Sequence, residues 1–442
     1  MNNDLFGTDG IRTKIGKKPL TIENLITLGK ALSVWTQQKY NKKINILLGH
    51  DPRQSSSLVK SALKTGLLLS PVTIYDAEVI STPALYAVMK KTKNYNFGIM
   101  ISASHNKYQD NGIKLFDLET GKLTQHDEQK ISDLFYDLLN NNDYNYSSLG
   151  QDYNYSDAFS VYKDSIKNKF SAHFLQNKKI VLDCANGATS DLAPQIFQEL
   201  GATVFTINNK PNGTNINQNC GTVFPNGLKA TVLKQKADFG FAFDGDGDRV
   251  CMVTHTGTIK NGDDILALLS HHNDYKNQPT IVGTIMTNHG FYNYLKQRNK
   301  TLIRTNVGDK NIAKELQEKK LLLGGEPSGH IICNDYLQMG DGIFTALKIL
   351  ETVNQINNKE LQSFKKMPQI LINLPVEKKK DLQSPTIKKI IAAHKTQLID
   401  GRLIIRYSGT EPLLRVMIEE SDYEKAKIIS NNICLALQKE LQ

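Results

Sequence analysis

The sequence predicts an α/β protein built from several domains, and three observations support this prediction. The chain has 442 residues, which at about 100 to 200 residues per domain indicates three or four domains. Apolar, β-branched runs alternate with helical stretches over its first three quarters, as in α/β units. A compact C-terminal part follows and ends in a helical-looking segment at residues 422–441.

Each expected strand ends in a loop of small and polar residues. Ligands of open α/β sheets bind at the carboxyl ends of the strands, so we expect functional groups in these loops. The expected strands, each with the loop after it, are residues 44–48 with 49–53, 97–101 with 102–106, 180–182 with 183–187, 239–243 with 244–249, and 403–405 with 406–412.

Three breaks divide the chain. Residues 140–155 are rich in Asn, Tyr, Asp and Ser and poor in aliphatic residues, which is typical of a linker or an exposed loop. Further breaks are expected near residues 254–261 and 355–366. The expected domains are therefore residues 1–150, 151–254, 255–362 and 363–442.

The composition excludes several classes of protein. Hydrophobic residues make up 40% and charged residues 22%, and neither a signal peptide nor a run of ~18 apolar residues is visible, so we expect a cytoplasmic protein. The five cysteines are widely spaced and should be reduced thiols. The net charge of +10 comes from scattered lysines without a basic stripe and interleaved aromatic residues. It therefore favours a small anionic substrate over nucleic acid.

Asp244, Asp246 and Asp248 form the most informative motif, because only glycines separate them and an apolar run precedes them. Glycine lets the backbone curl until the carboxylates face one point, which indicates a site for a hard cation. An EF-hand is excluded, since its glycine and glutamate positions hold Arg249 and His255. A solvated acidic turn is the plainer alternative. Arg249 beside a cation suggests a bridging anion such as phosphate.

Two further loops carry polar groups. Ser104 and His105 follow the expected strand at 97–101 and are candidates for a nucleophile and a group that orients what it carries. Glu326, Ser328 and His330 lie between glycines and suit the hydroxyl groups of a sugar. For both loops a hydrogen-bonded structural turn is the alternative.

A fourth loop, residues 406–412, suits an anion. Backbone N–H groups around a glycine form an anion nest, and arginine can clamp a phosphate with two hydrogen bonds. A turn that caps the strand at 403–405 is the alternative. The candidate residues are Arg406, Ser408, Gly409, Thr410 and Arg415.

In order, these loops resemble the phosphoserine, metal, sugar-binding and phosphate-binding loops of the α-D-phosphohexomutases, over essentially the whole chain. Within that superfamily the sequence most resembles the bacterial phosphoglucosamine mutases, through residues 5–12 (LFGTDGIR), 213–221 (GTNINQNCG) and 408–412 (SGTEP). The resemblance implies three successive α/β domains with mixed sheets and a smaller α+β C-terminal domain around a central cleft.

The resemblance also implies roles for single residues. Ser104 would be phosphorylated and would bind one Mg²⁺ together with Asp244, Asp246 and Asp248. Glu326 and Ser328 would contact the sugar, and Arg406, Ser408, Gly409, Thr410 and Arg415 would hold the phosphate that is not reacting. Arg12, His105, Lys114, Arg249 and His330 would surround the transferred phosphoryl group, and the sequence does not decide which group is the general base.

The implied activity is that of an isomerase. It would interconvert glucosamine 6-phosphate and glucosamine 1-phosphate through a phosphoserine enzyme and a 1,6-bisphosphate, and so supply UDP-N-acetylglucosamine and cell-wall precursors. A hexose 1,6-bisphosphate or a kinase would prime Ser104, whose phosphorylation would be required. A homodimer is compatible with the resemblance, although the sequence does not determine the oligomeric state, and no nucleic-acid or membrane partner is implied.

Two alternative functions differ in class. The same reaction on glucose or mannose phosphates would use the same catalytic groups, so only the sugar loop and substrate kinetics separate it. A catalytically silent sensor of sugar bisphosphates is the non-enzymatic alternative. The intact Ser104 and the three aspartates argue against a sensor.

Overall fold

The computed structural model describes residues 5–7, 9–40, 43–141, 148–356, 364–377, 379–407 and 413–441. The chain forms two compact units. Unit 1 consists of Met1–Gln278 and Val307–Leu361, and unit 2 consists of Pro279–Asn306 and Gln362–Gln442.

The first sheet of unit 1 is mixed. Its strands are β1 (Ile11–Lys14), β2 (Ile44–His50), β3 (Val72–Val79), β4 (Phe97–Ile101), β5 (Asp110–Asp117), β6 (Gly121–Lys122) and β7 (Gln151–Asn154). Their order is β1-β5-β4-β2-β3-β7, and β6 pairs with β5. The pairs β4–β2, β2–β3 and β3–β7 are parallel, whereas the pairs β1–β5, β4–β5 and β5–β6 are antiparallel.

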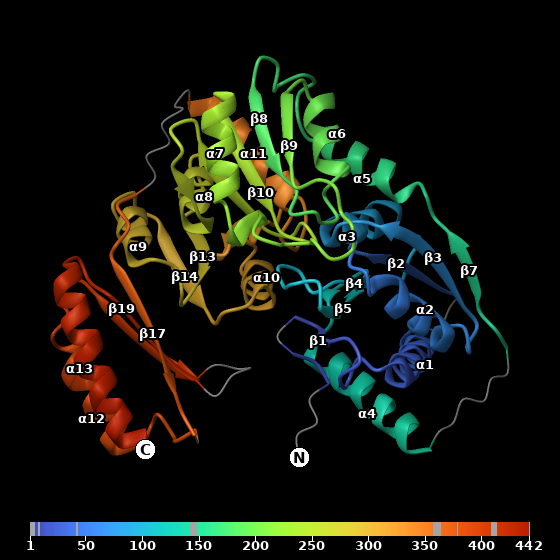
Figure 1. Ribbon diagram of the computed structural model, residues 1–442, viewed down its shortest axis with the longest axis horizontal. Helices are drawn as coiled ribbons and strands as arrows, with labels where there is room; N and C mark the ends of the chain where they lie inside the picture. The colour runs from blue at the N-terminus through green and yellow to red at the C-terminus, as the bar shows by residue number, and fades with distance from the viewer. Residues whose placement is uncertain are drawn as a thin grey trace. The chain divides into compact units, whose positions relative to one another are not determined.

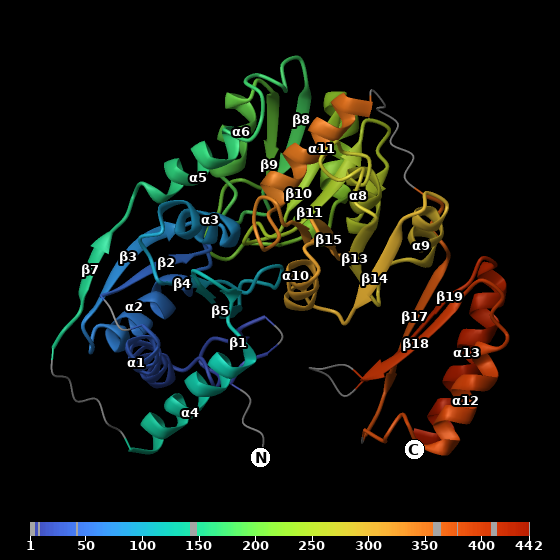
Figure 2. The same cartoon turned by 180° about the vertical axis from the view of Figure 1, so that it is seen from behind.

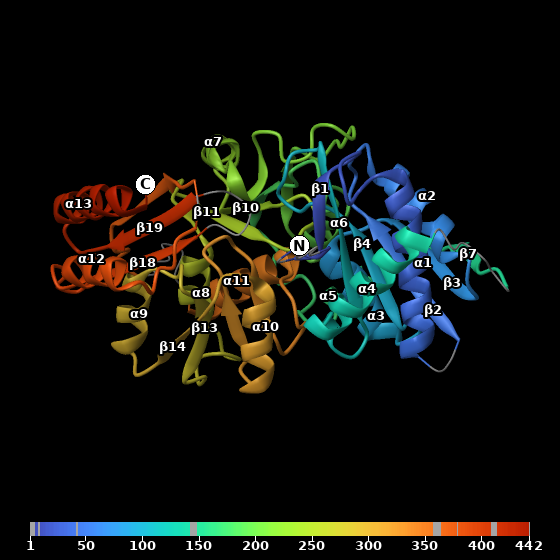
Figure 3. The same ribbon diagram turned by 90° about the horizontal axis from the view of Figure 1, so that it is seen from below.

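Four helices accompany this sheet, namely α1 (Ile22–Lys39), α2 (Ser56–Leu67), α3 (Thr82–Thr92) and α4 (Gln125–Asn141). Helix α1 packs against α2 and α4, as Figures 1 and 3 show. A Cβ atom at Gly66 would lie 1.9 Å from the Ile26 carbonyl oxygen, so the close approach of α1 and α2 requires glycine there. The core of this region includes Trp35, Phe97 and Phe135.

The second sheet of unit 1 is also mixed. It contains β8 (Lys179–Asp183), β9 (Thr203–Ile207), β10 (Phe239–Phe243), β11 (Val250–Thr254) and β12 (Ile259–Lys260). The order is β12-β11-β10-β8-β9, with β10, β8 and β9 parallel and β11 and β12 antiparallel. Helices α5 (Ala158–Lys167), α6 (Leu192–Glu199) and α7 (Asn226–Gln235) and the 3-10 turn η1 (Gly221–Val223) belong to this part of the chain.

The rest of unit 1 comprises α8 (Gly262–Leu269), α10 (Asp309–Glu318), β15 (Leu323–Gly325), β16 (Ile331–Cys333) and α11 (Gly342–Ile356). Helix α8 begins with a capping box, in which the side chains of Asn261 and Asp264 each accept the other's backbone N–H. Strands β15 and β16 form an antiparallel hairpin, and α11 packs against α8.

Unit 2 joins two separate stretches of the chain. The first contains the parallel strands β13 (Thr280–Thr284) and β14 (Thr301–Thr305) with α9 (His289–Lys296). The second contains the antiparallel sheet of β17 (Gln369–Pro375), β19 (Leu413–Glu419) and β18 (Arg402–Tyr407), with α12 (Pro385–Lys395) and α13 (Tyr423–Leu441) lying side by side (Figure 2). Asn288 Nδ2 donates to the Met367 carbonyl and to Glu419 Oε1, which ties the two stretches together.

The strands expected from the sequence are present, with one difference at the first break. The strands expected at 97–101 and 239–243 coincide with β4 and β10, and the C-terminal helix is α13. The linker expected at 140–155 is partly wrong, because α4 continues to Asn141 and residues 151–154 form β7, which pairs with β3. Strand β7 lies at the sheet edge and is exposed along its length, so no buried face marks it in the sequence.

The remaining expectations from composition concern membranes and thiols. No helix in the described part of the chain is long and apolar enough to cross a bilayer. All five cysteines are buried as free thiols, as their spacing predicted.

Candidate active site

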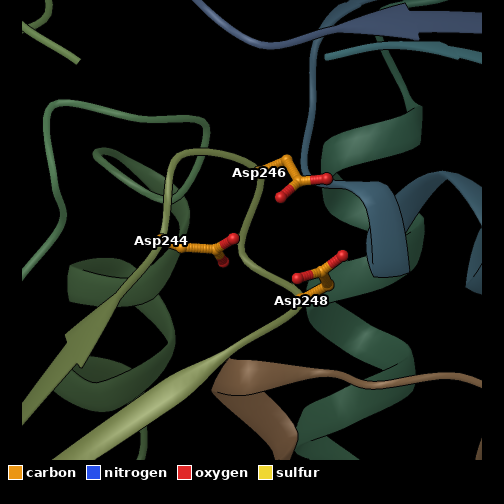
Figure 4. Close-up of side chains that lie close together, drawn as sticks. All are labelled: Asp244, Asp246 and Asp248. Atoms are coloured by element: carbon orange, nitrogen blue, oxygen red, sulfur yellow. The ribbon is translucent and has the colours of Figure 1, made fainter. Parts of the chain in front are cut away.

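The aspartate loop follows β10, whose five residues are all buried. Asp244, Asp246 and Asp248 are buried, and each offers a carboxylate oxygen within 4.8 Å of those of the others. Figure 4 shows the three side chains converging from this loop. A Cβ atom on Gly245 would lie 2.7 Å from the Ser104 carbonyl oxygen, and Gly247 has a φ of +78°. The glycines therefore allow the loop to turn and to approach the serine loop closely.

Ser104 lies in the loop after β4 and points to the aspartates. Its Oγ donates a hydrogen bond to Asp244 Oδ2 at 2.6 Å and lies 3.3 Å from His105 Nδ1. The residue is buried and has a φ of +51°, in the left-handed region that residues other than glycine rarely adopt. The structure therefore brings together the two motifs that the sequence predicted to act jointly.

Lys114 on β5 supplies the positive charge next to the carboxylates. Its Nζ donates to Asp246 Oδ2 and to Asp248 Oδ2, each at 2.8 Å. Burial disfavours the ammonium form, but Asp246, Asp248 and Asp9 outweigh it and raise the pKa of Lys114 well above its ordinary value. Burial, with Asp248 and Asp246 nearby, raises the pKa of Asp244 well above its ordinary value.

The pKa values of the two histidines of the site are shifted in opposite directions. Burial, followed by repulsion from Arg249 and Arg12, lowers the pKa of His105 to about 4, so this imidazole is neutral near pH 7. His330 lies 3.2 Å from Asp309 Oδ2 through Nε2 and 3.6 Å from Asp248 Oδ1 through Nδ1. Burial opposes its protonation, but Asp309 and Asp248 raise its pKa above the ordinary value.

The loop predicted to bind sugar lies near the aspartate loop. Glu326 Oε1 accepts a hydrogen bond from the Gly308 backbone N–H at 3.0 Å. A cavity of about 230 Å³ is lined by Ser328 and Arg249, among other residues. The Arg249 backbone N–H donates to Asp244 Oδ1 at 3.0 Å, and its Nε lies 3.9 Å from Asp248 Oδ1.

Arg12 on β1 reaches the cluster through Asp9. Its Nη2 donates to Asp9 Oδ2 at 2.6 Å, and the same oxygen lies 3.2 Å from Lys114 Nζ. Burial alone would raise the pKa of Asp9, but Lys114 and Lys122 hold it well below the ordinary value. Lys122 also pairs with Asp309, so the ion pairs continue to the carboxylate that contacts His330.

Arg406 and Arg415 lie in unit 2, on β18 and β19. They are directly opposite each other in the antiparallel register, and together with Met286, Leu371, Ile404 and Met417 they line a small cavity of about 30 Å³. Burial, followed by repulsion from Arg415, lowers the pKa of Arg406. Ser408, Gly409 and Thr410 lie outside the described residues.

Models of one protein family match the chain in four consecutive segments. The α/β/α domains I, II and III of the phosphoglucomutase/phosphomannomutase family match residues 3–141, 160–257 and 261–370, and the family's C-terminal domain matches residues 371–436. The chain belongs to this family. Its fold is therefore three α/β/α domains and a C-terminal domain, as the sequence predicted.

Relatives within the family place the chain among the phosphoglucosamine mutases. The phosphoglucosamine mutase of Caldicellulosiruptor saccharolyticus is 40% identical, over 99% of each chain. That of Lawsonia intracellularis is 37% identical over 100% of each chain.

Solved structures of the family share the fold. A phosphoglucomutase/phosphomannomutase family protein from Burkholderia thailandensis gives a TM-score of 0.81 at 21% identity, over 99% of this chain and 97% of that one. Aspergillus fumigatus N-acetylphosphoglucosamine mutase, solved in complex with GlcNAc-6P and magnesium, gives a TM-score of 0.67 at 17% identity, over 99% and 96% of the two chains.

The structure adds residues that sequence reasoning missed. Asp9, Lys122 and Asp309 form the ion-pair chain around Lys114 and His330, and Thr82 Oγ1 donates to Asp246 Oδ2 at 2.5 Å. Asp9 lies in the opening motif and was within reach of motif reasoning. Lys122, Asp309 and Thr82 carry no local signal, because their partners lie far away in the sequence.

Proposed function

We propose that this member of the family is a phosphoglucosamine mutase, which interconverts glucosamine 6-phosphate and glucosamine 1-phosphate through phospho-Ser104 and a 1,6-bisphosphate. The observation that carries the proposal is the hydrogen bond of 2.6 Å between Ser104 Oγ and Asp244 Oδ2, inside a cluster of three buried aspartates. A serine held against metal-type carboxylates suits a residue that carries and transfers a phosphoryl group.

The reaction requires two transfers. O6 and O1 of the sugar lie too far apart for a direct transfer, so phospho-Ser104 gives its phosphoryl group to the free sugar hydroxyl. The Oγ–P bond breaks, an O–P bond to the sugar forms, and the hydroxyl proton passes to a base. The 1,6-bisphosphate then turns end for end, and its other phosphoryl group returns to Ser104 Oγ. The cationic groups Arg12, Lys114 and Arg249, with His105 and His330, are the proposed surroundings of the moving phosphoryl group.

The aspartate loop fits a divalent cation with oxygen ligands. Asp246 Oδ1 is buried and accepts no hydrogen bond from any residue that the structure describes. Hard carboxylate oxygens without a soft ligand favour Mg²⁺. We propose that Asp244, Asp246, Asp248 and the phosphorylated Ser104 hold one Mg²⁺ per chain. When bound, this ion neutralises charge on the transferred phosphoryl group.

Binding roles are proposed for residues of each unit, taken separately. Glu326 and Ser328 of unit 1 are the proposed sugar contacts, and Arg406 and Arg415 of unit 2 the proposed clamp on the phosphate that is not reacting, with Ser408, Gly409 and Thr410. The opposed guanidinium groups of Arg406 and Arg415 support this role, because a phosphate would relieve their repulsion.

Domain limits, priming and assembly complete the proposal. The proposed domains are residues 1–150, 151–254, 255–362 and 363–442. A hexose 1,6-bisphosphate or a kinase would prime Ser104. The resemblance is compatible with a homodimer. The same reaction on glucose or mannose phosphates is the alternative function.

Replacement of the serine tests the proposal. Ser104→Ala should abolish turnover of glucosamine 6-phosphate in a coupled assay, while Ser61→Ala, at an exposed hydroxyl of α2, should keep it. Intact-mass analysis should find a form of the wild type about 80 Da heavier, the mass of one phosphoryl group on a hydroxyl, and no such form of Ser104→Ala. Ordinary turnover by Ser104→Ala would refute the intermediate. Glucose and mannose 6-phosphates assayed in parallel decide the substrate, and a preference for either would favour the alternative function.

A further inference from the structure

The loop that carries Ser104 is held by a buried arginine from another loop. The Arg53 guanidinium is buried and uses each of its five N–H groups, one for Asp51 Oδ2 and four for backbone carbonyls. Those carbonyls belong to Ser104, Asn106, Lys107 and Asp110. The side chain therefore binds the serine loop along its backbone and touches no reacting group.

Asn217 holds the same loop from the part of the chain around the second sheet. Its Nδ2 donates to the Ser104 carbonyl at 2.9 Å and to the Asn106 carbonyl at 3.0 Å. Each of these two carbonyls thus accepts from both Arg53 and Asn217. A carbonyl oxygen has two lone pairs, so its capacity is filled.

The other end of Ser104 is also fixed. Its backbone N–H donates to Ser102 Oγ at 2.9 Å, and Ser102 Oγ donates to Asp51 Oδ2 at 2.6 Å, the oxygen that binds Arg53 Nε. Asp51 and Ser102 have no measurable exposure. The N–H and C=O of the residue are thereby both held in its left-handed conformation, and only rotation about χ1 remains to move Oγ.

We infer that Arg53 and Asn217 are positioning residues, which keep the strained backbone of Ser104 in place while a phosphoryl group is received and given away. This inference rests on the proposed role of Ser104. A phosphoryl group adds about −1.5 to −2 charges when it arrives on Ser104 and removes them when it leaves, so the electrostatic force on the loop changes in each half of the reaction. Transfer needs the reacting atom within about 0.5 Å of its productive position, so a loop that relaxes would lose rate and not binding.

The decisive variant is Asn217→Asp. Aspartate has nearly the same shape and tolerates the left-handed backbone of residue 217, whose φ is +56°, but it replaces the donor with an oxygen that faces two carbonyls. Asn215→Asp is the matched control, with the same change of charge two residues away, because among the described residues the Asn215 Nδ2 donates only to the Lys210 carbonyl of the same segment. Arg53→Lys is the second variant, since lysine keeps the charge but has three donors in place of five.

Three measurements separate positioning from general stability. In Asn217→Asp and Arg53→Lys, kcat for glucosamine 6-phosphate should fall about 100-fold while KM stays within about threefold, and Asn215→Asp should match the wild type. Backbone hydrogen exchange of residues 102–107 should become at least about tenfold faster in Asn217→Asp. The reason is that the Ser104 and Asn106 carbonyls lose the hydrogen bonds from residue 217 that hold the loop. The Tm of Asn217→Asp should stay within about 4 °C of the wild type, as expected for a local change.

Two results would overturn the inference. One is a kcat of Asn217→Asp within threefold of that of Asn215→Asp. The other is a loss of kcat that follows a fall in Tm with unchanged exchange of residues 102–107, which would make the contacts merely structural. If Arg53→Lys does not fold, the results for Asn217→Asp alone decide whether the inference holds. A wild type that neither turns over glucosamine 6-phosphate nor carries phosphate on Ser104 would refute the proposed function instead. The hydrogen-exchange comparison would still decide whether Arg53 and Asn217 hold the serine loop.

Discussion

Lys114 is a single buried ammonium group among several carboxylates. It contacts Asp9, Asp246 and Asp248, and Asp244 lies in the same loop as the last two. Buried charges are costly unless they are paired, and among the described residues Lys114 is the only cation paired with Asp246, whose Oδ1 accepts no hydrogen bond. At the scale of the residue, this open carboxylate oxygen is the reason for expecting a divalent cation at the aspartate loop.

Asp341, before α11, leads to a prediction about pH. It is buried and accepts hydrogen bonds from Tyr162 Oη and from the Phe344 backbone N–H. Burial raises its pKa from 3.8 to about 6. The folded state then holds the proton more tightly than the unfolded state. The stability that Asp341 contributes is therefore fully present at low pH and falls as the pH rises from about 4 to about 6, by roughly 3 kcal/mol in total.

Asp341→Asn should remove this dependence, because the amide keeps a hydrogen-bonding group and carries no charge. We expect the Tm of the variant minus that of the wild type to increase between pH 4 and pH 7 and then to level off. Thermal unfolding of both proteins across this range measures it. A difference that is constant with pH, or that shrinks as the pH rises, would contradict the assignment. Glu128→Gln, at a partly exposed carboxylate, serves as the control.

At the scale of the element, the start of α3 contacts the aspartate loop. The Thr82 backbone N–H donates to the Asp246 carbonyl at 2.9 Å, and its Oγ1 donates to Asp246 Oδ2. Ser81 caps the helix by accepting from the Ala84 N–H, which fixes where Thr82 lies. A helix that accompanies the first sheet thus orients the Asp246 carboxylate, which lies in the loop after β10 of the second sheet.

Thr82→Val should therefore weaken Mg²⁺ binding. Valine keeps the shape but not the hydroxyl, and loss of such a supporting hydrogen bond typically lowers metal affinity about 10- to 100-fold. Isothermal titration calorimetry with Mg²⁺ measures the change. Thr92→Val on the same helix is the control, because Thr92 Oγ1 donates only to the Val88 carbonyl. Equal affinity of Thr82→Val and wild type would refute the supporting role.

The pairing of β18 with β19 sets Arg406 opposite Arg415. Like charges directly opposite each other destabilise a sheet, so such an arrangement favours a binding role over a structural one. Arg406→Gln should raise KM for glucosamine 6-phosphate about 10- to 100-fold, as expected for a lost charged hydrogen bond, and should leave Tm unchanged or higher. Lys389→Gln on the exposed side of α12 is the control. An unchanged KM would remove Arg406 from the phosphate site.

At the scale of the whole molecule, the two units have separate cores. Unit 1 contains the cluster around Trp35 and Phe97, and unit 2 contains the cluster around Val416 and Ile433. The three aspartates and Ser104 belong to unit 1. A ligand that binds only to folded unit 1 should stabilise that unit against unfolding.

Scanning calorimetry should accordingly show that magnesium stabilises the transition in which unit 1 unfolds. At a Mg²⁺ concentration of 100 times Kd, this transition should gain about 2.7 kcal/mol. Asp246→Asn should abolish the shift, because removal of one carboxylate charge weakens the cage. A shift of the same size in Asp246→Asn would place the ion elsewhere.

The sequence by itself determined the motifs whose parts are local. The three aspartates lie within five residues, and the glycines between them dictate a turn, so their convergence required no knowledge of the fold. The strands β4 and β10 were likewise recognisable from their continuous apolar runs. The roles assigned to single site residues stay predictions that the experiments above test.

Only the tertiary structure decided which distant residues serve these motifs. Thr82 and Asp246 are separated by 164 positions, Lys122 and Asp309 by 187, and Asn217 and Ser104 by 113. A threonine at a helix start, a lysine in a short strand or an asparagine in a loop has many ordinary uses, so the residue type predicts no partner. The order in which strands pair brings such positions together, and that order is set by burial of the sheet faces and not by any local pattern.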